Sequence, residues 1–171
     1  RDIPFGVSQN CVDKMQEIIK QRTGDLVEDF YSRVEAMDED KKKLLDSLMG
    51  DDKSVSISSL IYEPSNDGKE ATRVTSSKVL NSIVPNNKIM FGGSADLFGA
   101  NKTYVDHIGD FSASNREGGN IFFGVREHAM GAIMNGLALC GFRSYGSTFL
   151  SFSDYMKPAI RMACMMNLPV I

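Results

Sequence analysis

Apolar residues recur at helical spacing through the first part of the chain. Residues 8–22 predict a helix with Ser8 as its N-cap, and further helices are predicted for residues 25–35 and 38–49. The third helix opens with acidic residues and continues with basic ones, an order that suits the helix dipole, so its charges are expected on a solvated face. Residues 50–70 are polar and irregular, and are predicted to form a surface connection.

Beyond residue 70, short apolar stretches alternate with helical ones. The predicted strands are residues 88–92, 121–125 and 144–148 and the neighbourhood of Val170. The predicted helices are residues 72–84, 129–140 and 151–166. This alternation is typical of an α/β fold, in which a parallel sheet is covered by helices on both faces. We therefore expect an α/β domain at residues 70–171, preceded by a helical linker or N-terminal extension at residues 1–69.

The composition agrees with one folded domain. Of the 171 residues 42% are hydrophobic, enough to bury one core. The 19 basic and 22 acidic residues give a net charge of -3, which does not indicate nucleic-acid binding, and no apolar stretch is long enough to span a membrane. Cys11, Cys140 and Cys164 lack metal-ligand spacing and are predicted to be buried free thiols in a reducing compartment.

A carboxylate stands at the start of an apolar helix. The predicted strand 121–125 runs directly into this helix, and Glu127 lies in its first turn. Such a carboxylate is either an ordinary helix-start residue or is placed there for chemistry. Asp96 and Phe149 also follow predicted strands, and in parallel sheets ligands bind beyond the carboxyl ends of the strands.

Four segments match one family in order and spacing: residues 70–73 (EATR), 92–97 (GGSADL), 124–131 (GVREHAMG) and 147–155 (STFLSFSDY). Together they resemble the transketolases, which are thiamine-diphosphate enzymes. The chain is similar to the pyrimidine-binding middle domain of these enzymes, truncated at its C-terminal end. The resemblance implies that the intact protein transfers a two-carbon ketol unit from a ketose phosphate to an aldose phosphate, and that this fragment alone is inactive.

The resemblance assigns Glu127 a catalytic role. A carboxyl group that is hydrogen-bonded to N1′ of the cofactor's aminopyrimidine favours the imino tautomer, which can then remove the C2 proton of the thiazolium ring. Phe149, Phe152 and Tyr155 are three residues apart and so share one face. Spacing alone leaves a core stripe open for these aromatic residues, whereas the resemblance makes them the walls of the pyrimidine pocket.

Asp96 and Leu97 match residues that contact the cofactor in this family. The resemblance places Asp96 beside the cationic thiazolium region, where a negative charge is favoured, and makes Leu97 a neighbouring apolar contact. From the residues alone, an aspartate after a predicted strand end at Gly92 and Gly93 could instead cap a turn.

Arg73 is the candidate ligand for the terminal phosphate of the substrate. Its guanidinium offers forked donors to phosphate oxygens, although a solvated arginine on a first helical turn is the alternative. The family usually places a serine at the position of Ala100. The departure implies a weaker phosphate contact, one supplied by Asn101 or Lys102, or a shifted substrate preference.

No metal ligand is predicted in this chain, because no cluster of His, Cys and carboxylate residues has the spacing of a metal site. The resemblance implies a Mg or Ca ion that is held by the separate diphosphate-binding domain. His128 directly follows Glu127, so on a helix it points elsewhere, and it is predicted to be a structural histidine. His107 lies in a polar loop.

The resemblance also implies a cytoplasmic homodimer of the pentose phosphate pathway, with the cofactor between two subunits and sugar phosphates as substrates. Small residues would permit close helix packing: Ala129, Ala132 and Gly136. Adaptable apolar side chains would complete the interface: Met130, Met134 and Leu137.

Two kinds of alternative stay open. Dihydroxyacetone synthase, deoxyxylulose-phosphate synthase and the beta subunit of 2-oxo-acid dehydrogenases have the same domain, and the first of these also shares the sequence around Glu127 most closely. The other kind is a non-catalytic module that keeps the pyrimidine pocket for binding or assembly. Such a module would not need Glu127, because stacking and shape suffice for binding alone.

Overall fold

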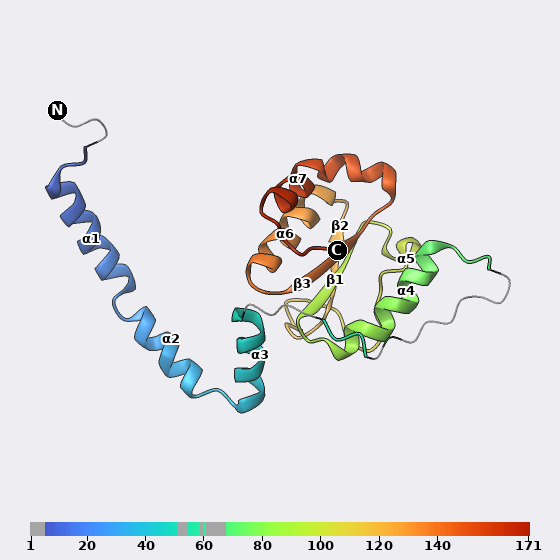
Figure 1. Cartoon of the computed structure of the whole chain (residues 1–171), viewed down its shortest axis with the longest axis horizontal. Helices are drawn as coiled ribbons and strands as arrows, with labels where there is room; N and C mark the ends of the chain where they lie inside the picture. Colours follow the sequence, from blue (N-terminus) through green and yellow to red (C-terminus); the bar gives the residue numbers. More distant parts are fainter. Residues whose placement is uncertain (1–5, 51–54, 59, 61–67) are drawn as a thin grey trace. The chain divides into compact units, whose positions relative to one another are not determined.

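The computed structural model describes residues 6–50, 55–58, 60 and 68–171 (Figure 1). Contacts between residues divide the chain into two compact units, residues 1–43 and residues 44–171. The predicted connection at residues 50–70 lies partly outside the described residues.

The N-terminal unit is helical, as predicted. Helix α1 spans Gln9–Thr23, α2 spans Leu26–Glu35 and α3 spans Glu39–Met49, the last of these crossing the boundary between the units. Ser8 is the N-cap of α1, and its hydroxyl accepts a hydrogen bond from the backbone N–H of Cys11 at 3.4 Å. None of the described residues of these three helices is buried.

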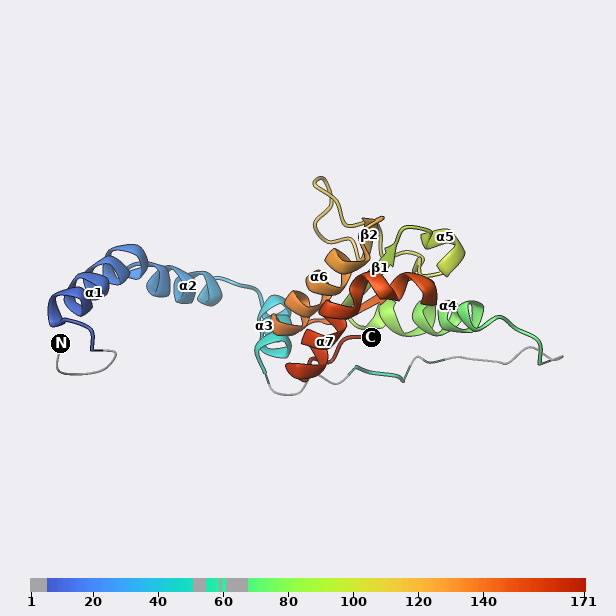
Figure 2. The same cartoon turned by 90° about the horizontal axis from the view of Figure 1, so that it is seen from above.

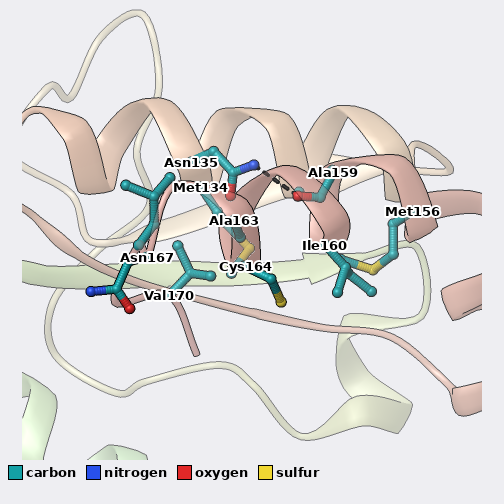
Figure 3. Close-up of a pocket in the computed structure, with 11 residues that line it drawn as sticks. Met134, Asn135, Met156, Ala159, Ile160, Ala163, Cys164, Asn167 and Val170 are labelled. Atoms are coloured by element: carbon teal, nitrogen blue, oxygen red, sulfur yellow. Dashed lines mark hydrogen bonds between the residues drawn. The ribbon is translucent and has the colours of Figure 1, made fainter.

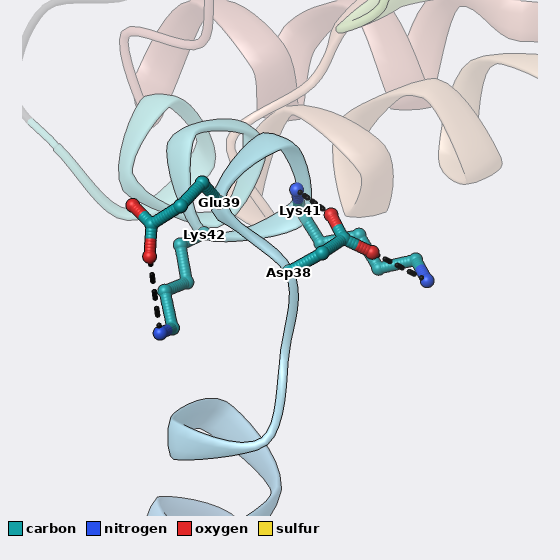
Figure 4. Close-up of polar contacts among 4 residues, drawn as sticks. All are labelled: Asp38, Glu39, Lys41 and Lys42. Carbon is teal, nitrogen blue, oxygen red and sulfur yellow. Dashed lines mark hydrogen bonds and ion pairs between the residues drawn. The ribbon is translucent and has the colours of Figure 1, made fainter.

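Charged residues cap the start of α3 (Figure 4). The Asp38 carboxylate accepts a hydrogen bond from the backbone N–H of Lys41 at 2.9 Å and forms an ion pair with the Lys41 ammonium at 3.0 Å. Glu39 and Lys42, each one residue further along, pair at 3.4 Å. Asp38, Glu39 and Lys41 are largely solvated, as the charge pattern predicted, and the Asp38 carboxylate satisfies a backbone donor that the helix leaves open.

The pKa of Asp38 is lowered below its ordinary value. The largest cause is the hydrogen bond from the Lys41 backbone, and the second is the hydrogen bond from the Lys41 side chain. Because the folded-state pKa is depressed, the stabilisation of this cap is complete above the unfolded-state pKa and is lost as the pH falls through the folded-state pKa. An NMR titration of the Asp38 carboxyl should therefore give a midpoint below the ordinary value. Lys41→Gln removes only the side-chain contribution, so its midpoint should rise part of the way; a wild-type midpoint at the ordinary value would contradict this prediction.

Three parallel strands form the sheet of the second unit. Their order is β2 (Asn120–Gly124), β1 (Met90–Ala95) and β3 (Arg143–Ser147). Helices cover both faces, which confirms the predicted fold class (Figure 1). Helix α4 (Thr72–Ile83) packs on one face, and α6 (Glu127–Leu139) packs on the other.

Each face has its own hydrophobic core. The core under α4 is formed by Val84, Met90, Val105 and Tyr145. The core under α6 is formed by Ala95, Phe123, Met130 and Met134. Helix α7 (Lys157–Met165) packs against α6 (Figure 2).

Strand β1 begins later than predicted and continues to Ala95, because Gly92 and Gly93 lie within the strand and do not end it. A Cβ on Gly92 would overlap the carbonyl oxygen of Tyr145 in β3, and one on Gly93 would overlap the carbonyl oxygen of Ile121 in β2. Glycine is required here by the close approach of both neighbouring strands, not by a turn.

The end of the chain also differs from the prediction. The helix expected at residues 151–166 is a 3₁₀ helix, η2 (Leu150–Met156), followed by α7, whose first turn contains Pro158. The strand expected at Val170 is not formed as a regular strand. Even so, Ile171 pairs with β3 through two backbone hydrogen bonds, from Gly146 N to its carbonyl at 3.0 Å and from its own N–H to the Ser144 carbonyl at 3.1 Å.

Two expectations about buried and exposed side chains are wrong. Met130 and Met134 are buried against the sheet and do not contribute to the exposed surface of α6. Gly146 in β3 has no side chain, and the sulfur atoms of both methionines fill the space where its Cβ would lie. The three cysteines are free, as predicted, but they are exposed and not buried.

Two asparagine side chains hold loop segments in place within the second unit. Asn120 at the start of β2 exchanges two hydrogen bonds with the backbone of Val105, at 2.9 and 2.8 Å. Asn87 forms the same kind of pair with Ser56, at 2.9 Å in both directions. A side-chain amide offers both a donor and an acceptor, so it can replace a missing strand partner for a loop backbone.

Candidate active site at the carboxyl edge of the sheet

The carboxyl ends of all three strands meet at one edge of the sheet. Asp96 follows β1 directly, Glu127 follows β2 after a two-residue turn, and Phe149 comes two residues after β3. The backbone N–H of Asp96 donates a hydrogen bond to the carbonyl of Gly124 at 2.7 Å, which joins the first two of these segments. The fold thus brings together residues that are up to 53 positions apart in the sequence.

A β-bulge marks the same edge. Ser94 pairs with Phe122, but Ala95 pairs with Gly124, so β2 contains one extra residue at this point. Bulges bend a strand and re-aim the side chains that follow it, and they are common beside active sites. Here the bulge immediately precedes Asp96 on one strand and the turn to α6 on the other.

Glu127 is the first residue of α6 and is only 7% exposed. Among the residues that the structure describes, none donates a hydrogen bond to its carboxylate. A carboxylate that is largely removed from water and accepts no protein hydrogen bond can bind a ligand that supplies a donor. Glu127 therefore has the burial and the open hydrogen-bonding capacity of a group that acts on a bound molecule.

Phe149, Phe152 and Tyr155 line the start of the segment after β3. Phe149 is the extended N-cap of η2, and the backbone N–H of Phe152 donates to its carbonyl at 2.8 Å. In a 3₁₀ helix, which has three residues per turn, side chains three apart are directly aligned, so the shared face is closer to ideal than in the predicted α-helix. The first two side chains are half-buried, whereas Tyr155 is 66% exposed.

Thr148 is a polar residue of this edge that the sequence reasoning did not single out. It lies between β3 and Phe149, and its hydroxyl is buried with no hydrogen-bond partner in the described part of the chain. A threonine at the end of a strand gives little signal by itself, and only its position beside the aromatic residues could have drawn attention to it.

Asp96 and Leu97 face the solvent in this chain. Asp96 has a backbone φ of 54°, a left-handed conformation that aspartate tolerates better than most residues. Leu97 is 46% exposed, although it is a large apolar residue. An exposed leucine next to an exposed carboxylate at a strand end is compatible with a ligand or partner that covers both.

The residues considered for a phosphate contact lie in different environments. Arg73 is exposed on the first turn of α4. Lys102 is exposed and ends the short helix α5 (Phe98–Asn101) in a left-handed conformation. Asn101 does not fit the expected role, because it is buried and its amide donates to the Ser94 hydroxyl at 2.6 Å.

Neither histidine forms part of a metal cluster. His128 is exposed in the first turn of α6, and His107 is exposed in a loop with a φ of 66°. Within residues 6–50, 55–58, 60 and 68–171, no three His, Cys, Asp or Glu residues are grouped so that they could hold a metal ion. A search of the same residues finds no helix with the length and apolarity needed to cross a membrane.

A separate hollow of about 390 Å³ lies between α6 and α7 (Figure 3). Apolar side chains line most of it, among them Met134 and Ile160, and the Asn135 amide donates to the Ala159 carbonyl at 2.9 Å beside it. None of the predicted cofactor residues contributes to its lining. The hollow is therefore distinct from the edge where the candidate chemistry lies.

Comparison with known proteins shows which family the chain resembles. Residues 69–171 match the family model "Transketolase, pyrimidine binding domain". The transketolase of Bacillus subtilis (strain 168) is 52% identical over 101 residues, which is 58% of this chain and 15% of that protein. The transketolase of Physarum polycephalum is 41% identical over 145 residues, which is 84% of this chain and 22% of that protein.

Solved structures show the same likeness over almost the whole chain. Transketolase from Campylobacter jejuni has a TM-score of 0.77 at 36% identity. The match covers 99% of this chain and 25% of the Campylobacter jejuni chain. Transketolase from Pichia stipitis in complex with sedoheptulose 7-phosphate has a TM-score of 0.80 at 30% identity, covering 99% of this chain and 26% of its own. The chain thus spans about a quarter or less of the proteins that it resembles.

Proposed function

The chain belongs to the transketolase family through its pyrimidine-binding domain, and on that premise we propose that it forms part of an enzyme that transfers a two-carbon ketol unit from a ketose phosphate to an aldose phosphate. The observation that carries this proposal is the buried Glu127 carboxylate, which starts α6 at the carboxyl edge of the sheet and accepts no hydrogen bond from the described residues.

The residues at this edge fit the aminopyrimidine of thiamine diphosphate. Glu127 offers a carboxylate that accepts no hydrogen bond from the described residues, and Thr148 has a buried hydroxyl without a partner among them. Phe149 and Phe152 offer half-buried aromatic faces for a flat ring. When bound, thiamine diphosphate supplies the nucleophilic carbon that accepts and passes on the two-carbon unit.

Each side chain then has a separate task. Glu127 would share a proton with the N1′ position of the pyrimidine, as a positioned acid–base partner. Phe149, Phe152 and Tyr155 hold the ring and exclude water from it. Asp96 places a negative charge, and Leu97 an apolar surface, beside the cationic part of the cofactor.

Substrate and partner contacts complete the proposal. Arg73 and Lys102 are exposed cations and are the candidates for the substrate phosphate, with Arg73 able to bind two oxygens at once. A homodimer would cover the outer face of α6, where Ala132, Gly136 and Ile133 are exposed. The Mg or Ca ion would bind outside this chain, in the diphosphate-binding domain, and the intact enzyme would act in the cytoplasm.

The test is an assay of the intact gene product with xylulose 5-phosphate and ribose 5-phosphate. We expect ketol transfer that requires both thiamine diphosphate and a divalent ion, and that is absent from the 171-residue chain alone. Transfer that continues after the cofactor has been removed and its absence verified would contradict the proposal. Tight cofactor binding without transfer between any ketose and aldose phosphates would favour a related thiamine enzyme or a binding module.

A further inference from the structure

A chain of buried hydrogen bonds connects two sides of the candidate site. The Asn101 amide donates to the Ser94 hydroxyl at 2.6 Å, and this hydroxyl lies 2.9 Å from the carbonyl of Ser147. Ser94 is 1% exposed and Asn101 is 7% exposed. The connection therefore runs from α5 across the end of β1 to the end of β3; its first hydrogen bond is buried and its second is partly buried.

The direction of these bonds follows from the chemistry of the groups. An amide nitrogen can only donate, so the Ser94 oxygen must accept from Asn101 and use its single proton elsewhere. The nearer acceptor for that proton is the Ser147 carbonyl, since the carbonyl of Ala95 lies at 3.2 Å. Without Asn101 the Ser94 hydroxyl loses a partner that water cannot easily replace.

Both ends of this connection hold proposed cofactor contacts. Asn101 closes the turn that begins at Asp96, and its backbone N–H donates to the Leu97 carbonyl at 2.9 Å. Asp96 itself has a left-handed φ of 54°, a conformation that persists only when its surroundings maintain it. At the other end, Ser147 directly precedes Thr148 and Phe149.

We propose that Asn101 is a positioning residue, which acts through Ser94 to fix the turn bearing Asp96 and Leu97 relative to the aromatic wall that begins at Phe149. This inference rests on the proposed function, because both groups must contact one bound cofactor. A ligand that touches two loops binds tightly only when the loops are already at the correct separation.

The experiment uses the intact gene product with the variants Asn101→Ala, Ser94→Ala and the double variant. Asn87→Ala is the matched control, because Asn87 is also a buried asparagine that ties a loop, but it does so through Ser56 and not at the carboxyl edge. The dissociation constant of thiamine diphosphate is measured by titration, and the melting temperature of each cofactor-free variant is measured beside it.

Asn101→Ala should raise the dissociation constant of thiamine diphosphate about tenfold. Asn87→Ala should lower the melting temperature about as much as Asn101→Ala does. Its dissociation constant for thiamine diphosphate should stay within about twofold of the wild-type value. Since Asn101 and Ser94 act through one connection, the double variant should bind the cofactor no more weakly than the worse single variant. Equal cofactor affinity in Asn101→Ala and Asn87→Ala would overturn the proposal.

Amide hydrogen exchange of the cofactor-free protein separates this inference from the proposed function. Asn101→Ala should speed exchange in residues 96–104 and also in residues 147–152, whereas Asn87→Ala should affect neither segment. If wild-type protein binds no thiamine diphosphate, the proposed function fails, and exchange that rises in both segments still supports the coupling. Exchange that rises only around residue 101 would overturn it.

Discussion

Replacing Glu127 by alanine in the intact gene product is expected to lower kcat for ketol transfer by about a hundred- to ten-thousand-fold, the range of acid–base catalysis by a positioned side chain. Glu127 is 7% exposed and starts α6 after the two-residue turn that follows β2. The measurement is steady-state transfer between pentose phosphates at saturating cofactor.

Two further variants separate catalysis from folding. Glu127→Gln keeps the shape of the side chain but cannot share a proton in the same way, so its kcat should also collapse. Its cofactor-free melting temperature should stay equal or rise, because a buried carboxylate without a donor is unfavourable for stability. Glu117→Ala, in an exposed loop, is the matched control and should retain full activity. Unchanged kcat in Glu127→Gln would refute the assigned role.

The second large effect is expected from Gly93→Ala, which should cost at least about 3 kcal/mol of folding free energy. A Cβ at this position would overlap the backbone carbonyl oxygen of Ile121. Backbone atoms of a paired strand cannot move aside as a flexible side chain can, so β1 and β2 would have to separate. A loss of this size is a large share of the stability of a typical domain.

Gly99→Ala is the control, because a Cβ on Gly99 has no neighbouring atom within 4 Å. This variant should change the folding free energy by less than about 0.5 kcal/mol. Urea denaturation followed by circular dichroism measures both variants. Comparable midpoints for Gly93→Ala and Gly99→Ala would show that β1 tolerates a wider separation from its neighbour than the structure indicates.

Local patterns in the sequence were enough to predict most of the helices and the order of the three strands. Ser8 and the charged residues around Asp38 act on backbone groups within one turn, so their effect is visible at short range. The α/β class followed from alternating apolar stretches, and the position of Glu127 followed from a strand that runs directly into a helix. All of these features depend on neighbours a few residues away.

Tertiary structure decided the features that depend on distant neighbours. Gly92 and Gly93 suggested a turn, yet adjacent strands require them inside β1. Met130 and Met134 suggested a surface, yet Gly146 leaves room to bury them.

The same holds for the polar residues of the site. Asn101 suggested a phosphate ligand, but it donates to Ser94, and Thr148 gave no signal until its hydroxyl was seen to be buried without a partner. The sequence by itself thus determined the elements, their class and the residue types at the carboxyl edge. Which backbone atoms approach closely, and which polar groups stay without a partner, was decided only by the packing of segments that are separate in the sequence, because such contacts produce no periodic pattern in it.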